Sequence, residues 1–382
     1  MKRISAILLA ALAVSCTCNQ IQGPDLPDPI EVELEGMTLR EKVGQLFCVR
    51  PEAFDVALEW ESYEDLANNQ LQEVTPQMLR VNGQYPVGGI ILFAHNIKDE
   101  PQLDTLVKQL KAFNGSPLLY IDEEGGRVAR IANNPAFQVE KFPPMGTIGK
   151  TGDRNEARRC GNTIGRYLKR YGFDVDLAPV ADVNTNPANP VIGTRAFSPD
   201  PAVASEMVVA CLKGLKAAGI AGCVKHFPGH GDTKADTHYG YAQTRKSWEE
   251  MLACEMLPFK AAIAADVPMI MTAHIAAPAV TGSSIPATLS PVLLQEKLRG
   301  ELGYDGVIIT DGMGMGAITR QYKPAQATLL GLEAGADIIL GPKNFTEAFD
   351  AVMKAVQVDS TLTEARIDES VRRILRLKAS LR

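Results

Sequence analysis

The sequence lacks the long apolar runs and the basic clusters that mark membrane-spanning and nucleic-acid-binding proteins. Its only long apolar run, Ile4 to Val14, is about half as long as a bilayer-spanning helix. The chain has 39 Lys and Arg against 45 Asp and Glu, a formal net charge of −6. Because phosphate neutralisation needs clustered cations, we expect no nucleic-acid partner. Hydrophobic residues make up 46% of the 382, which excludes a disordered chain.

Cysteine is sparse and scattered. Cys16 and Cys18 lie close to the N-terminus, and no C-x-x-C pair occurs anywhere in the chain. The other five of the seven cysteines stand apart: Cys48, Cys160, Cys211, Cys223 and Cys254. A chain of this length does not need disulfides to fold, so the sequence predicts buried free thiols.

The N-terminus has the pattern of an export signal. Lys2 and Arg3 precede the apolar run, which ends in small residues directly before Cys16. A charged region followed by a short apolar one is typical of a secretory signal peptide. The cysteine at its end resembles a bacterial lipoprotein signal, in which residues 1–15 are removed and Cys16 is lipidated. Cleavage by an ordinary signal peptidase after a small residue is the alternative.

The lipoprotein interpretation also predicts a location. Residues 16–36 contain Pro24, Pro27 and Pro29 and are interpreted as a tether. We therefore expect an exported, lipid-anchored protein at the periplasmic or outer-membrane face, with the anchor as its only contact with a membrane.

The rest of the chain alternates short apolar runs with amphipathic stretches. Eight short runs are mostly apolar and do not alternate with polar residues: Leu46–Val49, Gly89–Phe93, Leu118–Ile121, Val175–Ala178, Gly222–Val224, Met269–Met271, Val307–Ile309 and Asp337–Leu340. Such runs fit strands buried on both faces of a parallel sheet. Helical patterns such as Ala202–Ala217 and Trp248–Ala265 lie between them. Repeated strand-then-helix units of this number predict an α/β fold, a single (β/α)8 TIM-type barrel over residues 37–382.

A doubly wound open sheet is the competing fold, but no Gly-x-Gly-x-x-Gly motif follows the first predicted strand. Capping boxes at Thr38–Glu41 and Thr361–Glu364 predict where the folded part and its last helix begin. The last helix has one apolar face, made by Val371, Ile374, Leu375 and Leu377. We expect no second domain beyond it.

Titratable side chains follow nearly every predicted strand. They are Arg50, His95, Asp122, Asp182, Lys225, His226, His274 and Asp311. Because a barrel carries its chemistry at the C-terminal ends of its strands, this pattern indicates an active site. His95 and His274 fit equally well as buried core histidines that bind no ligand.

The densest cluster is the run KHFPGHGDTKADTH at residues 225–238, which holds three of the five histidines. Its glycines and proline break regular structure, so it is interpreted as an active-site loop. His226, His230 and His238 fit a zinc site. Alternatively, Asp236 orients the imidazole of His238 for proton transfer, because an Asp-x-His spacing in an extended loop puts both side chains on one side.

This run resembles the signature of family 3 glycoside hydrolases, and more narrowly of their bacterial β-N-acetylglucosaminidases of the NagZ type. Four further motifs match in the family's order: IDEEGGRV at 121–128, VIGTRAF at 191–197, MTAHI at 271–275 and ITDGM at 309–313. The resemblance runs from about Met37 to the C-terminus. It implies a TIM-type barrel and hydrolysis of glycosides.

The resemblance also implies a retaining mechanism through a covalent glycosyl-enzyme, with no metal and no organic cofactor. The residue that matches the family's nucleophile is Asp311. His238 matches the general acid/base, paired with Asp236. An imidazole, with an ordinary pKa near ~6.5, suits proton transfer in both directions near neutral pH. A helix N-cap is the alternative role for Asp311, because a helical pattern follows it.

Five residues match the family's contacts with sugar hydroxyls: Asp122, Arg130, Arg195, Lys225 and His226. Charged groups suit a polyol because charge-assisted hydrogen bonds are strong. Met315 is expected to line the sugar pocket, with a core position as the alternative. Four further residues are expected to hold loops in place: Glu124, Arg127, His230 and Asp232.

The expected function is removal of terminal β-linked N-acetylglucosamine from the non-reducing end of a carbohydrate partner. Muropeptides from peptidoglycan turnover are the family's usual substrate. The alternatives are a β-glucosidase-type or other family 3 glycosidase, a zinc-dependent barrel hydrolase, and a non-catalytic sugar-binding lipoprotein. The Asp-x-His pair favours the N-acetylglucosaminidases, because the family's two-domain β-glucosidases take their acid, a glutamate, from a second domain.

Overall fold

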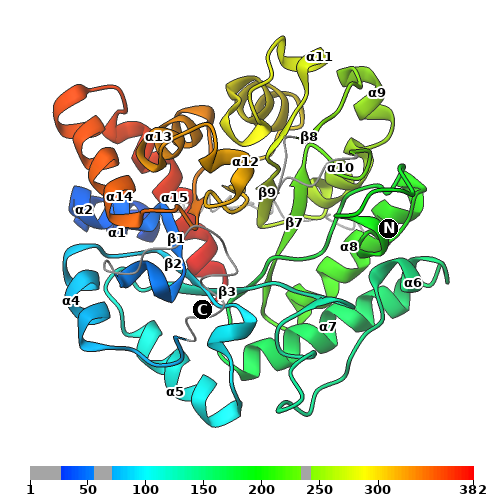
Figure 1. Ribbon diagram of the computed structural model, residues 1–382, viewed down its shortest axis with the longest axis horizontal. Coiled ribbons are helices and arrows are strands. Elements are labelled where there is room, and N and C mark those ends of the chain that lie inside the picture. Colours follow the sequence, from blue (N-terminus) through cyan, green and yellow to red (C-terminus); the bar gives the residue numbers. More distant parts are fainter. Residues whose placement is uncertain (1–26, 56–70, 234–241) are drawn as a thin grey trace, which may run out of the picture.

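The computed structural model describes residues 27–55, 71–233 and 242–382, and its centre is a barrel of parallel strands (Figure 1). The strands are β1 (Phe47–Val49), β2 (Gly89–Ile91), β3 (Leu118–Ile121), β6 (Val175–Asp176), β7 (Ala221–Phe227), β9 (Met269–Thr272), β11 (Val307–Ile309) and β12 (Ile339–Leu340). They neighbour one another in the order β12-β1-β2-β3-β6-β7-β9-β11. A parallel bridge between Ile309 and Ile338 joins the two ends.

This arrangement confirms the predicted TIM-type barrel, and the doubly wound alternative is wrong. All eight predicted strands occur; Leu118–Ile121 and Val307–Ile309 have the predicted ends, and the ends of the other six shift. The largest shift is in β7, which extends to Phe227 and is buried along its whole length. Lys225 and His226 therefore lie inside a strand, which is possible because both side chains have charged partners there.

Helices surround the barrel in Figure 1. The α-helices are α1 (Pro29–Gly36), α2 (Leu39–Gln45), α4 (Pro76–Gln84), α5 (Glu100–Lys111), α6 (Met145–Gly149), α7 (Arg154–Arg170), α8 (Pro201–Ala217), α9 (Trp248–Ala253), α10 (Met256–Ala264), α11 (Pro278–Thr281), α12 (Gly316–Thr319), α13 (Pro324–Ala334), α14 (Phe345–Lys354) and α15 (Glu364–Ser380). Within the described ranges, no helix has the length and apolar character that crossing a bilayer requires.

Shorter elements lie mainly in the connections. Two small ladders pair β4 (Glu123–Gly125) with β5 (Val128–Ala129) and β8 (Ala242–Gln243) with β10 (Ile275–Ala276). The single-turn and π-type segments are η1 (Pro51–Phe54), η2 (Ala94–Asn96), η3 (Gly193–Arg195), η4 (Ala287–Leu289), η5 (Val292–Glu301) and η6 (Ala355–Asp359).

The first helix corrects the predicted boundary of the tether. Residues 29–36 form α1 instead of an extended tether, so the folded part begins before the capping box at Thr38. Asp28 caps this helix and Leu34 is buried. Glu31 accepts two hydrogen bonds from Arg372 of α15, at 2.5 and 2.9 Å. Residues 1–26, with the predicted signal peptide and Cys16, lie outside the described residues.

Two other predicted helices differ from the structure: the last one has a different cap, and another is divided in two. The last helix begins at Glu364 with Thr363 as its cap, so the capping box predicted from Thr361 is wrong. Leu362 and Ile367 are both buried, which favours the later cap because they flank it as a hydrophobic staple. The pattern Trp248–Ala265 divides into α9 and α10.

Four of the five cysteines in the described ranges are buried free thiols, as predicted: Cys48, Cys160, Cys211 and Cys223. Cys254 is also free but only half-buried, because it lies at the break between α9 and α10.

A buried lysine closes the end of the barrel opposite the predicted active site. The ammonium of Lys378 in α15 donates to Gln45 Oε1 at 2.6 Å and to the carbonyls of Gly115 and Ser116 at 2.9 and 2.8 Å. Burial lowers the pKa of Lys378 from 10.5 to about 8, since all three acceptors are uncharged.

The lowered pKa of Lys378 predicts a pH-dependent contribution to stability. Between pH 8 and 10.5 the unfolded chain binds this proton more readily than the folded protein does. The free energy of unfolding of the wild type should therefore rise with pH in that window, by up to about 3 kcal/mol relative to Lys378→Met. Urea unfolding of both proteins at several pH values measures this difference, and parallel pH profiles would contradict it.

Candidate active site

A cavity of about 300 Å³ lies at the C-terminal ends of the barrel strands. Each strand contributes a lining residue near its C-terminal end: Arg50, Ile91, Asp122, Leu177, Lys225, Met271, Asp311 and Leu340. Because parallel strands end at the same rim, residues far apart in the sequence meet here.

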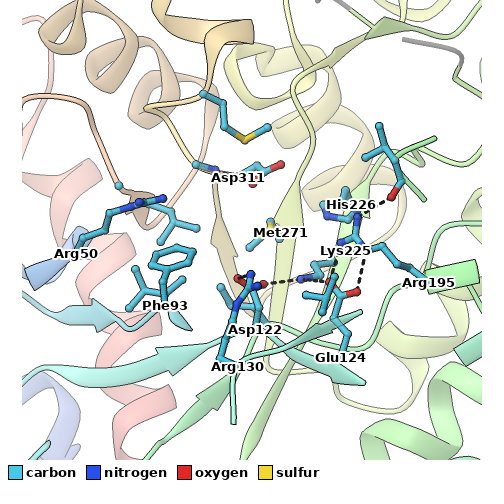
Figure 2. Close-up of a pocket in the computed structure, with 18 of the residues that line it drawn as sticks. Arg50, Phe93, Asp122, Glu124, Arg130, Arg195, Lys225, His226, Met271 and Asp311 are labelled. Atoms are coloured by element: carbon cyan, nitrogen blue, oxygen red, sulfur yellow. Dashed lines mark hydrogen bonds and ion pairs between the residues drawn. The ribbon is translucent and has the colours of Figure 1, made fainter. Parts of the chain in front are cut away.

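Seven predicted site residues line this one cavity: Asp122, Arg130, Arg195, Lys225, His226, Asp311 and Met315. In Figure 2, Asp311 lies across the cavity from Asp122 and Arg130. Asp236 and His238 lie outside the described residues, so their roles stay predictions.

Lys225 is the centre of a buried charge cluster. Its ammonium lies 2.7 Å from Asp122 Oδ1 and 2.6 Å from Glu124 Oε1, and the residue is only 2% exposed. Burial alone would lower the pKa of Lys225, but the two carboxylates raise it above its ordinary value. The lysine is therefore a fixed cation and not a proton donor near neutral pH.

Glu124 binds a second cation, Arg195, in addition to Lys225. Arg195 binds Glu124 in a bidentate geometry, with Nε 2.8 Å from Oε2 and Nη2 2.7 Å from Oε1. Burial disfavours the carboxylate, but Arg195 and Lys225 outweigh it and keep the pKa of Glu124 far below its ordinary value. Glu124 thus holds Arg195 and Lys225 in place, which is the supporting role predicted for it.

Asp122 has a looser set of partners. Besides Lys225, Arg130 Nη2 lies 3.4 Å from its Oδ2. Burial would raise the pKa of Asp122, but Lys225 and then Arg130 lower it. Asp122 is therefore an ionised acceptor at the cavity wall, suited to a sugar hydroxyl.

Asp182 orients two histidines. Its Oδ2 lies 2.7 Å from His226 Nδ1, and its Oδ1 accepts the backbone N–H of His230 at 2.6 Å. Burial opposes the ionised form, yet His226 lowers the pKa of Asp182, so the carboxylate accepts and Nδ1 donates. The Nε2 atom of His226 is then the ring nitrogen available to a molecule in the cavity.

Asp311 is half-buried on the loop after β11. Its Oδ1 accepts the backbone N–H of Gly312 at 2.7 Å. The helix that follows, α12, begins at Gly316 after Met315, so the N-cap alternative for Asp311 is wrong. Met315 is buried and lines the cavity.

The two histidines with open assignments differ in the structure. His274 is fully buried, and its ring lies 2.9 Å from Thr288 Oγ1 and 3.0 Å from the Gly312 carbonyl. It is a core histidine that supports the loop of Asp311. His95 lines the cavity instead, with Nε2 2.9 Å from Glu52 Oε1.

Of the remaining predicted supporting residues, Arg127 and Asp232 contact neighbouring loops, whereas His230 bonds within its own loop and lines the cavity. Arg127 donates to the carbonyls of Pro190 and Val191 at 3.3 and 2.6 Å. The His230 ring bonds to the Thr233 hydroxyl at 2.7 Å, and burial lowers the pKa of His230. Asp232 accepts from the Thr185 hydroxyl at 3.3 Å.

Only two of the three histidines of the zinc alternative, His226 and His230, lie in the described ranges. In the ranges that the structure describes, no three His, Cys, Asp or Glu side chains are grouped to hold a metal ion. His226 and His230 each use Nδ1 for an internal partner, and His238 lies outside these ranges.

Sequence reasoning missed two features of the cavity wall. Arg50 stacks on Phe93, with its guanidinium carbon 4.1 Å from the ring centroid. Asp182 was visible as a titratable residue after a strand, but no motif linked it to His226. A buried carboxylate that follows one strand and binds a histidine of the neighbouring strand has no local sequence signal.

The arrangement combines a carboxylate on a glycine-flanked loop with a wall of fixed charges. Asp311 faces a space bounded by ionised Asp122, Lys225 and Arg195. A polyol fits such a wall because each hydroxyl both donates and accepts. A carboxylate in such a place can act as a nucleophile or stabilise positive charge on a bound molecule.

Comparisons with known proteins agree on one family. Residues 38–377 match the family described as the glycosyl hydrolase family 3 N terminal domain. A β-hexosaminidase A from Pseudoalteromonas piscicida is 36% identical over 333 residues, covering 80% of this chain and 55% of that protein. A β-hexosaminidase from Thiobacillus denitrificans is 35% identical over 280 residues, covering 72% and 76% of the two chains.

A solved structure shares the fold over most of the chain. It is a glycoside hydrolase family 3 β-N-acetylglucosaminidase from Paenibacillus, with a TM-score of 0.78 and 36% identity, covering 90% of this chain and 63% of that one. The chain thus spans a little over half of the Pseudoalteromonas protein and under two thirds of the Paenibacillus one.

Proposed function

The chain belongs to glycosyl hydrolase family 3, and we propose that it is a retaining exo-β-N-acetylglucosaminidase. It would release terminal N-acetylglucosamine from the non-reducing end of a glycan. The single observation that supports this most is the shared cavity, in which Asp311 faces the charge cluster of Asp122, Lys225 and Arg195. The relatives described as β-hexosaminidases support the choice of sugar.

In the first proposed step, Asp311 attacks the anomeric carbon and the bond to the leaving oxygen breaks. His238, oriented by Asp236, gives its proton to that oxygen. Asp122, Arg130, Arg195, Lys225 and His226 hold the sugar hydroxyls during this step. The product is a covalent glycosyl-enzyme on Asp311.

In the second proposed step, the same histidine works as a base. His238 takes a proton from water, the water oxygen attacks the anomeric carbon, and the bond to Asp311 breaks. Two inversions give net retention, and the enzyme regains its starting protonation.

Hydrolysis of two aryl glycosides tests the choice of sugar. The enzyme should release p-nitrophenol from the β-N-acetylglucosaminide with a kcat/KM at least about tenfold higher than from the β-glucoside, because an acetamido group adds contacts that a hydroxyl lacks. Faster release from the β-glucoside would favour the β-glucosidase alternative. No release from either would favour the non-catalytic sugar-binding protein.

We also propose that the natural substrate is a muropeptide or related glycan met outside the cytoplasm, since the N-terminus resembles a lipoprotein signal.

If Cys16 carries the lipid, Cys16→Ser should shift the protein from the membrane fraction to the soluble fraction, because acyl chains supply the anchor. Fractionation with immunoblotting measures this. An unchanged distribution would remove the lipoprotein proposal and leave the enzymology untouched.

A further inference from the structure

Glu123 stands between two cavity residues, Asp122 and Glu124, but its own side chain does not line the cavity. The residue is 0% exposed. Its carboxylate accepts four hydrogen bonds: Oε2 from the backbone N–H of Arg130 (2.5 Å) and Ile131 (2.9 Å), and Oε1 from the backbone N–H of Ala132 (2.9 Å) and the hydroxyl of Tyr167 (2.8 Å). Three of the four donors are thus consecutive backbone amides of one loop.

That loop carries Arg130, whose side chain has few anchors of its own. Its Nη2 lies 3.4 Å from Asp122, a long contact. Its Nε is buried with no hydrogen-bond partner among the described residues. The guanidinium carbon lies 5.7 Å from the centroid of the Phe93 ring. The position of the guanidinium in the cavity therefore depends on where the backbone of residue 130 is held.

The backbone before Arg130 turns through two glycines. Gly125 and Gly126 have φ angles of +89° and +57°. The short hairpin of β4 and β5 has a register irregularity between Glu123 and Gly125. The turn depends on these glycines, because L side chains rarely adopt such φ angles, and the glycines contribute no side chain that could hold residue 130 in place.

Glu123 itself is held from the barrel side. Its backbone N–H donates to Asp176 Oδ1 at 3.0 Å, and Tyr167 reaches it from α7. Burial raises the pKa of Glu123, whereas the amide donors favour the ionised form. The carboxylate thus links the amides of residues 130–132 to the barrel and to α7.

We propose that Glu123 is a positioning residue: its hydrogen bonds to the loop amides hold the guanidinium of Arg130 where it can bind the substrate. This inference rests on the proposed function, in which Arg130 contacts a sugar hydroxyl. Because that contact forms in the ground state and in the transition state alike, the loss of Glu123 should act on KM and hardly on kcat.

The first test removes the acceptor while keeping the length of the side chain. Glu123→Met should raise KM for the p-nitrophenyl β-N-acetylglucosaminide by about tenfold or more, with kcat changed by less than about threefold. Tyr167→Phe is the matched control, because it removes one buried hydrogen bond from the same carboxylate but touches no loop amide. It should leave KM within about twofold.

A double-mutant cycle separates positioning from general damage. In an Arg130→Ala background, adding Glu123→Met should change KM by less than about twofold, since the residue acts only through Arg130. An equal rise in KM with and without Arg130 would overturn the proposal, as would a rise of the same size in Tyr167→Phe.

Glu123→Gln serves if the Met variant does not fold. Its carbonyl oxygen still accepts from Arg130 and Ile131, and its amide can donate to Tyr167, so KM should rise by only about twofold to fivefold. That rise must again vanish in the Arg130→Ala background.

Hydrogen exchange tests the role of Glu123 without a measurement of enzymatic activity. If the wild type hydrolyses neither aryl glycoside, the proposed function fails, but the amide measurement still decides on Glu123. The amides of residues 130–132 should be protected in the wild type and exchange at least about tenfold faster in Glu123→Met. In Glu123→Gln the faster exchange should be confined to Ala132, whose acceptor Oε1 is replaced by an NH2 group. Unchanged exchange rates would overturn the role of Glu123.

Discussion

Asp311→Asn should lower turnover of the β-N-acetylglucosaminide by about 10⁴-fold or more, because loss of a nucleophile in other enzymes costs up to ~10⁶-fold. An amide cannot form the glycosyl ester on which the proposed retaining mechanism depends. The fold and the affinity for N-acetylglucosamine should stay close to those of the wild type, since Asn still accepts from the Gly312 N–H. Steady-state kinetics and calorimetric titration with the sugar measure both effects.

Chemical labelling gives the independent check on Asp311. A 2-fluoro glycoside should trap the glycosyl-enzyme, and mass spectrometry should find the label on Asp311. Asp232→Asn is the control, because Asp232 contacts Thr185 outside the cavity wall. Label on Asp232 or Asp236 would show that the nucleophile is another residue.

His238→Ala should lose far more activity on a sugar–sugar bond than on an activated aryl glycoside. General acid/base catalysis is worth about 10²–10⁴-fold, and a sugar leaving group needs that proton most. An aryl oxygen leaves without much help, so the first step on an aryl glycoside should suffer little. Rates on N,N′-diacetylchitobiose and on the p-nitrophenyl glycoside give the comparison.

Two further measurements separate this pair from a zinc site. Asp236→Ala should give a milder form of the same defect, because it only orients the imidazole of His238. A zinc ligand would behave differently, since its loss should damage both substrates alike and chelator should lower both rates. Equal losses together with chelator sensitivity would replace the proposed mechanism with the metal one.

The barrel was predictable from the sequence because its strands are buried on both faces. Continuous apolar runs such as Val307–Ile309 have no other common place in a soluble α/β protein. Helix ends were less predictable. Thr361 and Thr363 both offer a hydroxyl, and only the burial of Leu362 and Ile367 selects the second. The same holds for α1, whose Glu31 binds Arg372 of α15, more than 300 residues away.

Two histidines of the site also show what the sequence predicts and what only tertiary packing decides. Both His95 and His274 follow a predicted strand, with an alanine before each, and the sequence leaves their roles equal. In the barrel, His274 turns into the core against Thr288, whereas His95 reaches the cavity beside Glu52. Which side a residue takes after a strand depends on how the following loop packs.

By itself, the sequence determined the class of fold, the order of the strands and the residues that could carry the chemistry. Periodicity, the polarity of residues after strands and short motifs are local properties, so they can be recognised in the sequence alone. Only the tertiary structure decided the partners of those residues. Lys225 sits between Asp122 and Glu124, Arg195 lies on Glu124, and Asp182 binds His226, although these pairs are 44 to 103 positions apart. Such pairings arise because parallel strands bring distant strand ends to one rim, where a buried charge is stable only beside its counter-ion.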